Sequence, residues 1–204
     1  TRVRSSAASD VYKRQIIACV MSPNHGTEPG ALAPTFRLPN ANASVGESEI
    51  DLESVLEGAG GIVMFTCNHC PYVVASEARI ESVAAFAAKS DLGFVGINSN
   101  DPVRYVSDDW EHMVKRASQG MTYPYLHDST QDVAMAYGAE RTPEFYLISN
   151  SREIVYRGRL DDSPRDPSSS TTADLMDAVK EFLEGKAVTN KRTESIGCSV
   201  KWKE

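Results

Sequence analysis

The chain has 204 residues, which is enough for one compact domain with extra segments at its ends. Hydrophobic residues make up 41% and charged residues 24%, as in ordinary globular proteins, and no apolar run approaches the roughly 20 residues of a membrane helix. The net charge of −7 does not favour binding to nucleic acid or to an anionic membrane. We therefore expect no nucleic-acid partner, no membrane partner and a cytoplasmic location, although the sequence leaves open a leader upstream.

The N-terminal segment is rich in Pro, Gly and Asn up to residue 34, which predicts a disordered arm. Residues 5–15 resemble the translation of a common sequencing-library adapter, and we interpret them as an artefact. The natural start is then expected at Met21, with Cys19 outside the natural protein. The predicted division is a disordered arm at 1–32, a folded domain at 33–185 and a C-terminal tail at 186–204.

Hydrophobic patterning predicts alternating strands and helices in chain order. The first elements are a short strand at 36–38, helical turns at 51–56, a buried strand at 62–66, a helix at 71–88 and a buried strand at 92–97. They continue with a helix near 107–117 that has Ser107 as N-cap, a short strand at 123–126, and a helix from 128 or 129 that Gly138 closes. The last are a hairpin of 145–148 and 154–156, a polar loop at 161–170 and a helix at 175–183. This order predicts an α/β fold, a central mixed sheet with helices on both faces.

A Cys-Asn-His-Cys-Pro motif at residues 67–71 stands between the strand at 62–66 and the helix that follows. This placement is expected to put Cys67 at the helix N-terminus and Cys70 inside the helix. Free N–H groups and the helix dipole favour a thiolate there, and a thiolate is the nucleophile of disulfide exchange. Four cysteines are too few for a disulfide scaffold, so the pair predicts a redox site.

A Cys-x-x-Cys pair can also be half of a zinc site, which needs a second pair of ligands at suitable spacing. His112 and His127 are single and lack that spacing, so thiol chemistry is favoured. We interpret His69 as a partly protonated imidazole that stabilises the Cys67 thiolate and makes the disulfide a better oxidant. Glu144 has two interpretations, a solvated carboxylate at a strand end or a proton acceptor for Cys70.

These motifs together resemble the thioredoxin-like superfamily, and within it the redoxin branch related to alkyl hydroperoxide reductase and thiol-specific antioxidant proteins. The likeness spans about 33–182 and rests on residues 67–72, 137–139, 141–145 and 156–162, with the tail 195–202. The resemblance implies a thioredoxin-like fold with Cys67 as the attacking cysteine, Cys70 as the resolving cysteine and Pro143 as the cis-proline. A cis-Pro143 is expected to leave the Thr142 backbone free to pair with an incoming peptide.

Asn68 and Pro71 complete the predicted substrate-binding residues, together with Thr142. Cys198 is expected to be an unreactive thiol in a docked tail. Two departures from the superfamily matter. The strand at 62–66 lacks the buried acid of thioredoxin, so proton transfer needs another group or water. The peroxiredoxin pattern Pro-x-x-x-Thr/Ser-x-x-Cys is absent, because Gly60 and Met64 precede Cys67 at its positions.

The sequence thus predicts a thiol–disulfide oxidoreductase that uses the Cys67–Cys70 pair on protein or small-molecule disulfides, with no bound cofactor and no metal. Two alternatives stay open. One is a thiol peroxidase that uses Cys67, and the other is a Cu(I)-binding chaperone with Cys67, Cys70 and a distal histidine. The physiological electron donor or acceptor is not determined by the sequence.

Overall fold

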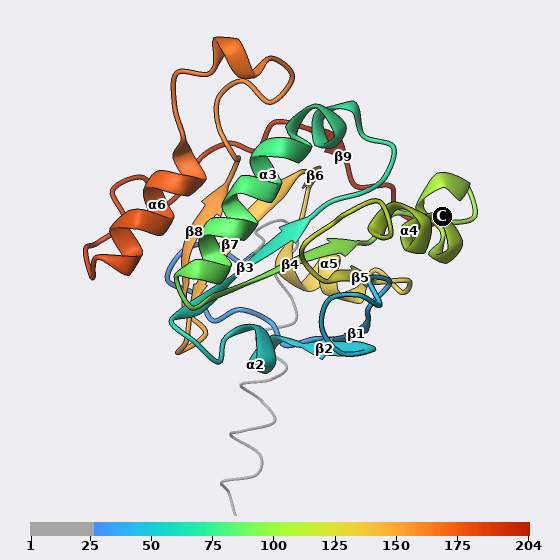
Figure 1. Ribbon diagram of the computed structural model, residues 1–204, viewed down its shortest axis with the longest axis horizontal. Coiled ribbons are helices and arrows are strands. Elements are labelled where there is room, and N and C mark those ends of the chain that lie inside the picture. Colours follow the sequence, from blue (N-terminus) through green and yellow to red (C-terminus); the bar gives the residue numbers. More distant parts are fainter. Residues whose placement is uncertain (1–26) are drawn as a thin grey trace, which may run out of the picture.

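The computed structural model describes residues 27–204, and its centre is a five-stranded mixed sheet (Figure 1). The strands lie in the order β5-β4-β3-β7-β8. They are β3 (Gly60–Phe65), β4 (Leu92–Asn98), β5 (Tyr125–His127), β7 (Glu144–Ser149) and β8 (Ile154–Gly158). The first three of these run parallel, whereas β7 is antiparallel to β3 and β8 is antiparallel to β7. The predicted mixed sheet and the predicted hairpin are both confirmed.

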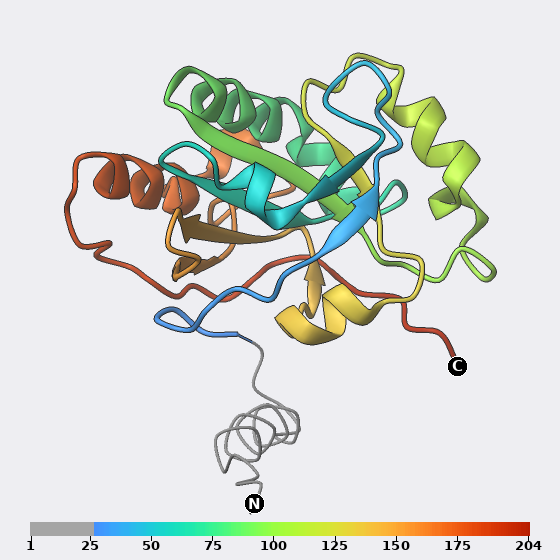
Figure 2. The same cartoon turned by 90° about the horizontal axis from the view of Figure 1, so that it is seen from below.

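Helices cover both faces of this sheet, as predicted (Figure 2). One face carries α3 (Pro71–Lys89) and α6 (Asp174–Leu183), and the other carries α2 (Leu52–Val55) and α5 (Asp132–Tyr137). Ile62 and Met64 of β3 pack toward the first pair of helices, while Val63 and Phe65 pack toward the second. Because β3 is covered on both sides, it is apolar without alternation. Within residues 27–204, no helix is both long and apolar enough to cross a membrane.

Two helix starts differ from the prediction. Helix α4 (Trp110–Ala117) begins after a 3-10 turn at Val106–Asp108, and its N-cap is Asp109, whose carboxylate accepts the His112 N–H at 2.9 Å. The prediction of Ser107 as N-cap is therefore wrong. Helix α5 begins at Asp132, although the Asp128 carboxylate still accepts an N–H of its first turn. Gly138 ends α5 in the left-handed conformation, as predicted.

The N-terminal part of the described chain is fastened to the domain. The Gly30 N–H donates to the Ile154 carbonyl at 2.8 Å, and Leu32 pairs with Glu153. The predicted disordered arm is therefore wrong for residues 27–32, while residues 1–26, including the adapter-like segment and Met21, lie outside the described residues. Strands β1 (Arg37–Pro39) and β2 (Glu49–Asp51) form a separate antiparallel pair, of which only the first was predicted.

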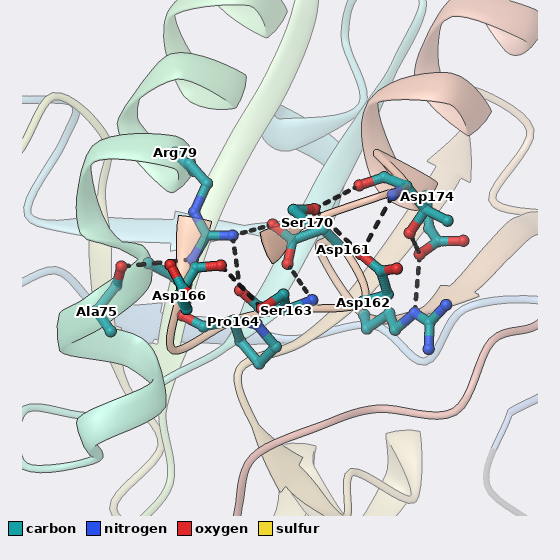
Figure 3. A network of polar contacts seen from close by, with 12 residues as sticks. Ala75, Arg79, Asp161, Asp162, Ser163, Pro164, Asp166, Ser170 and Asp174 are labelled. Atoms are coloured by element: carbon teal, nitrogen blue, oxygen red, sulfur yellow. Dashed lines mark hydrogen bonds and ion pairs between the residues drawn. The ribbon is translucent and has the colours of Figure 1, made fainter. Parts of the chain in front are cut away.

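The polar loop predicted at 161–170 is held against α3 (Figure 3). Arg79 of α3 pairs with Asp161 and donates to the Pro164 carbonyl at 2.7 Å. At the end of the loop, Arg159 pairs with Asp174 at the start of α6 at 2.8 Å. The charged residues of the 156–162 motif therefore position this loop.

The C-terminal tail crosses the domain and adds a short strand. Strand β9 (Cys198–Ser199) pairs antiparallel with β6 (Arg141–Thr142), directly before Pro143. Further along, the Lys201 N–H donates to the Asn100 side chain at 2.8 Å, and Val200 is buried. The tail thus lies beside the loop that carries the predicted cis-proline.

Candidate active site

The two motif cysteines lie where β3 ends and α3 begins. Both are free thiols, and both side chains are completely buried. Helix α3 begins at Pro71, so Cys70 is its N-cap residue, although its side chain makes no capping hydrogen bond to the helix. The expectation that Cys67 lies nearest the helix N–H groups, with Cys70 inside the helix, is wrong because the helix begins after the second cysteine.

Contact between the thiols separates their acidities. The hydrogen bond from Cys67 lowers the pKa of Cys70 to about 4, aided by donors from Cys198 and Val73. The same contact, together with burial, raises the pKa of Cys67. Because the two thiols interact, the low value describes the first ionisation of the pair. The reduced pair therefore loses its first proton more readily than an ordinary thiol does, and the lowered pKa makes Cys70 the favoured site of the charge.

His69 is oriented by the carboxylate of Asp108, which is not among the predicted site residues. Its Nδ1 lies 2.5 Å from Oδ2 of Asp108, and its ring stacks on Tyr105 with centroids 5.1 Å apart. Because a carboxylate only accepts hydrogen bonds, the proton lies on Nδ1. The charge of Asp108 also raises the pKa of Cys67, so a protonated His69 offsets a charge that disfavours the thiolate.

Asp108 is completely buried and accepts hydrogen bonds from two segments of the chain, residues 68–69 and 98–100. It accepts the Asn68 N–H at 2.6 Å, and the amides of Asn98 and Asn100 at 3.2 and 2.9 Å. The strand at 62–66 lacks the buried acid that thioredoxin carries. Here Asp108, which comes from another segment, is a buried acid near the dithiol. One sequence signal could have located Asp108. The predicted strands β3 and β4 are parallel, so the turns that follow them meet at one edge of the sheet.

Asn68 bonds within the protein. Its side chain accepts from the Tyr125 hydroxyl at 2.8 Å and donates to the Ser107 carbonyl at 2.7 Å, while its carbonyl accepts from Arg116 at 3.0 Å. These contacts hold the turn between the cysteines and leave the predicted substrate-binding role of Asn68 without a free polar group. Pro71 is exposed at the first position of α3.

The Thr142–Pro143 bond is cis, as expected. The Thr142 hydroxyl lies 3.4 Å from the Cys67 sulfur, and the Cys70 thiol donates to the Thr142 carbonyl at 3.1 Å. Pro143 and Thr142 are therefore brought to the dithiol. The expectation of a free Thr142 backbone is wrong, however, because Thr142 pairs with Cys198 of the protein's own tail.

Glu144 lies in a buried ion pair. Its Oε1 accepts from Arg157 at 2.8 Å, and its Oε2 accepts the N–H groups of Glu140 and Arg141 at 2.8 and 3.2 Å. The Glu144 side chain is 1% exposed, so the interpretation as a solvated carboxylate is wrong. Both oxygens are engaged away from the thiols, and the proton-acceptor role has no support in these contacts.

Three residues at this site offer atoms of the kinds that bind metal ions. A sulfur of Cys67, a ring nitrogen of His69 and a carboxylate oxygen of Asp108 lie within 4.8 Å of one another. His112 pairs with Asp109 on the surface, and the ring of His127 lies 5.9 Å from that of Trp110 at a tilt of 30°.

Comparisons with known proteins show the family and the fold of this chain. The model of the Redoxin family matches residues 28–175. A structure titled as an uncharacterized conserved protein from Geobacillus kaustophilus is 38% identical, with a TM-score of 0.80, covering 90% of this chain and 98% of that one. A hypothetical protein from Sinorhizobium meliloti is 36% identical, with a TM-score of 0.77, covering 90% and 97%.

More distant likenesses show the fold alone. A putative protein disulfide isomerase from Bacteroides thetaiotaomicron is 20% identical, with a TM-score of 0.56, and the likeness covers 80% of this chain and 95% of that one. No curated protein matched this chain. The predicted thioredoxin-like α/β fold is confirmed.

Proposed function

Because this chain belongs to the Redoxin family, with a role in thiol redox chemistry, we propose that it is a thiol–disulfide oxidoreductase whose redox pair is Cys67 and Cys70. One observation carries the proposal: two free, buried thiols lie together where β3 ends and α3 begins, and the contact of Cys67 with Cys70 lowers the pKa of Cys70. A pair with one thiolate and one thiol at neutral pH has both the nucleophile and the resolving group that disulfide exchange needs.

The reaction exchanges one disulfide for another. The thiolate attacks a sulfur of the substrate disulfide, forms a mixed disulfide and expels one substrate thiolate. The second cysteine then attacks the mixed disulfide, its proton passes to the departing substrate sulfur, and the Cys67–Cys70 disulfide forms. The resemblance assigns the first attack to Cys67, whereas the lowered pKa of Cys70, caused mainly by its contact with Cys67, favours Cys70.

The substrate class follows from access to the pair. The backbone of Thr142, beside the cis-proline, is paired with strand β9 of the same chain. A protein substrate that docked there as an extended strand would have to displace the tail, whereas a small disulfide would not use that edge. We therefore propose small-molecule disulfides as the first class to test.

A single-turnover experiment tests the proposal. Reduced protein is mixed with oxidised glutathione or, separately, with hydrogen peroxide at the same concentration, and the Cys67–Cys70 disulfide is measured by mass spectrometry after acid quenching. Oxidised glutathione should act at least about tenfold faster, a barrier difference of about 1.4 kcal/mol. Trapping the mixed disulfide in Cys67→Ser and Cys70→Ser identifies the attacking residue, and Cys19→Ser serves as the matched thiol control.

A thiol peroxidase is the second candidate, and the burial of both thiols favours it because peroxide is small. Peroxide would oxidise the thiolate to a sulfenic acid, which the other thiol would convert to the disulfide with release of water. Faster oxidation by peroxide than by oxidised glutathione in the same experiment would support this candidate and contradict the disulfide-exchange proposal.

A further inference from the structure

A third thiol lies beside the buried pair. Cys198 stands opposite Thr142 in the β6–β9 pairing, and the Thr142 carbonyl accepts the hydrogen bond of the Cys70 thiol at 3.1 Å. Cys198 packs against the hydrophobic cluster that contains Cys67 and Cys70, and the proximity of its thiol and its N–H lowers the pKa of Cys70. Cys70 is therefore flanked by two other thiols.

The three thiols differ in their access to solvent. Cys67 and Cys70 are completely buried, whereas Cys198 is partly exposed. An external thiol therefore reaches Cys198 with less movement of the protein than access to the other two cysteines requires. Disulfide exchange needs direct approach of the attacking sulfur. The difference in exposure therefore makes Cys198 the cysteine that an external thiol reaches first.

The tail is fixed firmly enough to hold this position. The Asp101 N–H and the Gln131 side chain both donate to the Lys201 carbonyl, each at 2.8 Å. On the other side of Cys198, a side-chain carbon at Gly197 would lie 2.1 Å from the Thr142 carbonyl oxygen, so only glycine permits this approach. The position of Cys198 thus depends on specific contacts at both ends of β9.

We propose that Cys198 is a third redox cysteine, which exchanges disulfides with Cys70 and connects the buried Cys67–Cys70 pair to external thiols. The inference rests on the redox pair of the proposed function and adds to it the residue through which the pair is reduced. It also replaces the expectation that Cys198 is an unreactive thiol.

The exchange needs no further oxidant. The Cys198 sulfur attacks the Cys70 sulfur of the Cys67–Cys70 disulfide; the Cys70–Cys198 bond forms, the Cys67–Cys70 bond breaks, and Cys67 leaves with the proton that Cys198 gives up. An external thiol then attacks the exposed Cys198 sulfur and expels Cys70 as a thiolate. A second external thiol reduces the mixed disulfide, so two external thiols become one disulfide and the protein regains three reduced cysteines. Because the pKa of Cys70 is lowered to about 4, Cys70 is a good leaving group in the second step.

Peptide mapping tests the connection directly. The full chain carrying Cys19→Ser is equilibrated in glutathione redox buffers, quenched in acid, alkylated and digested with trypsin without reduction. Trypsin leaves Cys67 and Cys70 in one peptide, residues 38–79, and Cys198 in another, residues 193–201. A Cys70–Cys198 disulfide therefore links two peptides, whereas a Cys67–Cys70 disulfide stays within one.

The expected result is a linked pair of peptides in which Cys67 carries the alkyl group. The linked species should become the main oxidised form in Cys67→Ser and should fall at least about tenfold in Cys70→Ser. Suppose that the parent protein forms the Cys67–Cys70 disulfide, and that no linked peptides appear in the parent or in Cys67→Ser. The third-cysteine inference is then wrong, and the proposed function stands. If neither disulfide forms, the proposed function fails as well.

A rate measurement separates an exchange role from a purely structural one. Reduction of the oxidised pair by dithiothreitol should slow at least about tenfold in Cys198→Ser, while the equilibrium constant of the pair with glutathione changes little. Circular dichroism checks that the variant is folded. An unchanged rate of reduction in folded Cys198→Ser would overturn the inference.

Discussion

At the scale of single residues, the chemistry of this site depends on a buried charge that lies outside the Cys-x-x-Cys motif. Asp108 accepts hydrogen bonds from the motif backbone and from His69, and its charge disfavours a thiolate at Cys67. A protonated His69 offsets that charge. His69 and Asp108 therefore act on the thiols as one unit.

Replacing His69 by alanine should make the couple more reducing. A positive charge on the imidazole stabilises the thiolate of the reduced form, so loss of the side chain should lower the reduction potential, by about 30 mV for each 1.4 kcal/mol. The measurement is equilibration with glutathione. His112→Ala removes a matched histidine that pairs with an aspartate on the surface and should leave the potential unchanged. A higher potential in His69→Ala would contradict the charge argument.

The acidity of the pair also predicts how the stability of the reduced form depends on pH. The pKa of Cys70 is lowered in the folded protein, so its contribution to stability is present above the ordinary thiol pKa of about 8.5 and is lost as pH falls toward 4. The raised pKa of Cys67 acts in the opposite sense, and its contribution is lost as pH rises above about 8.5. The reduced form should therefore lose stability relative to the oxidised form between pH 8 and pH 4.

Thermal unfolding of both redox forms across this range measures the effect. Carboxylates titrate in both forms, so the difference in Tm between reduced and oxidised protein isolates the thiols. The difference should shift against the reduced form by several degrees as pH falls. A constant difference would show that the pair holds no thiolate at neutral pH.

At the scale of the elements, the short β6–β9 pairing controls access to the thiols. β9 occupies the edge beside cis-Pro143, and Gly197 permits its close approach to Thr142. The pairing lies outside the five-stranded sheet, so it can be loosened without breaking the core.

Gly197→Ala should loosen the tail and expose the pair. A side-chain carbon there would collide with a backbone oxygen, so β9 must move away from β6. Alkylation of Cys67 and Cys70 in the reduced protein should speed up about tenfold, corresponding to about 1.4 kcal/mol of lost protection. The control is Ser199→Ala, an exposed position on the same strand. Equal labelling rates in wild type, Gly197→Ala and Ser199→Ala would show that the tail does not protect the pair.

At the scale of the whole molecule, one buried ion pair joins distant parts of the chain. Arg157 on β8 bonds to Glu144 on β7 and to the Gly138 carbonyl, at 2.8 and 2.7 Å, and also to Glu28 from the N-terminal segment. Arg157 and Glu144 are each 1% exposed, so neither can lose its partner without leaving a buried charge.

Glu144→Ala should therefore lower the free energy of unfolding by about 3–5 kcal/mol, measured by urea denaturation of the oxidised protein. Glu28→Ala removes the half-exposed partner of the same arginine and should cost about 1 kcal/mol or less. Glu144→Gln tests the catalytic alternative, because loss of a general base would slow single-turnover oxidation about 10²-fold or more. A rate close to wild type in folded Glu144→Gln would assign Glu144 to structure.

Short windows of sequence were enough to predict the alternation of strands and helices and the cysteine pair between β3 and α3, and the resemblance predicted the cis-proline before β7. These features are local, because apolar runs, a Cys-x-x-Cys motif and an X-Pro bond can be recognised within short windows. The resemblance to redoxins predicted the thioredoxin-like fold, and the match of the Redoxin family model to residues 28–175 confirms it.

The polar groups that surround the thiols are set by contacts between segments that are distant in the sequence. Asp108 and Asp109 are adjacent aspartates that the sequence pattern does not distinguish. Asp109 caps α4, whereas Asp108 is buried and contacts His69. Cys198 is more than 120 residues from Cys70 in the chain, and only the pairing of β9 with β6 brings it to that sulfur. Burial and long-range contact set the charge on a thiol and its access to solvent, and neither is encoded within a short window of sequence.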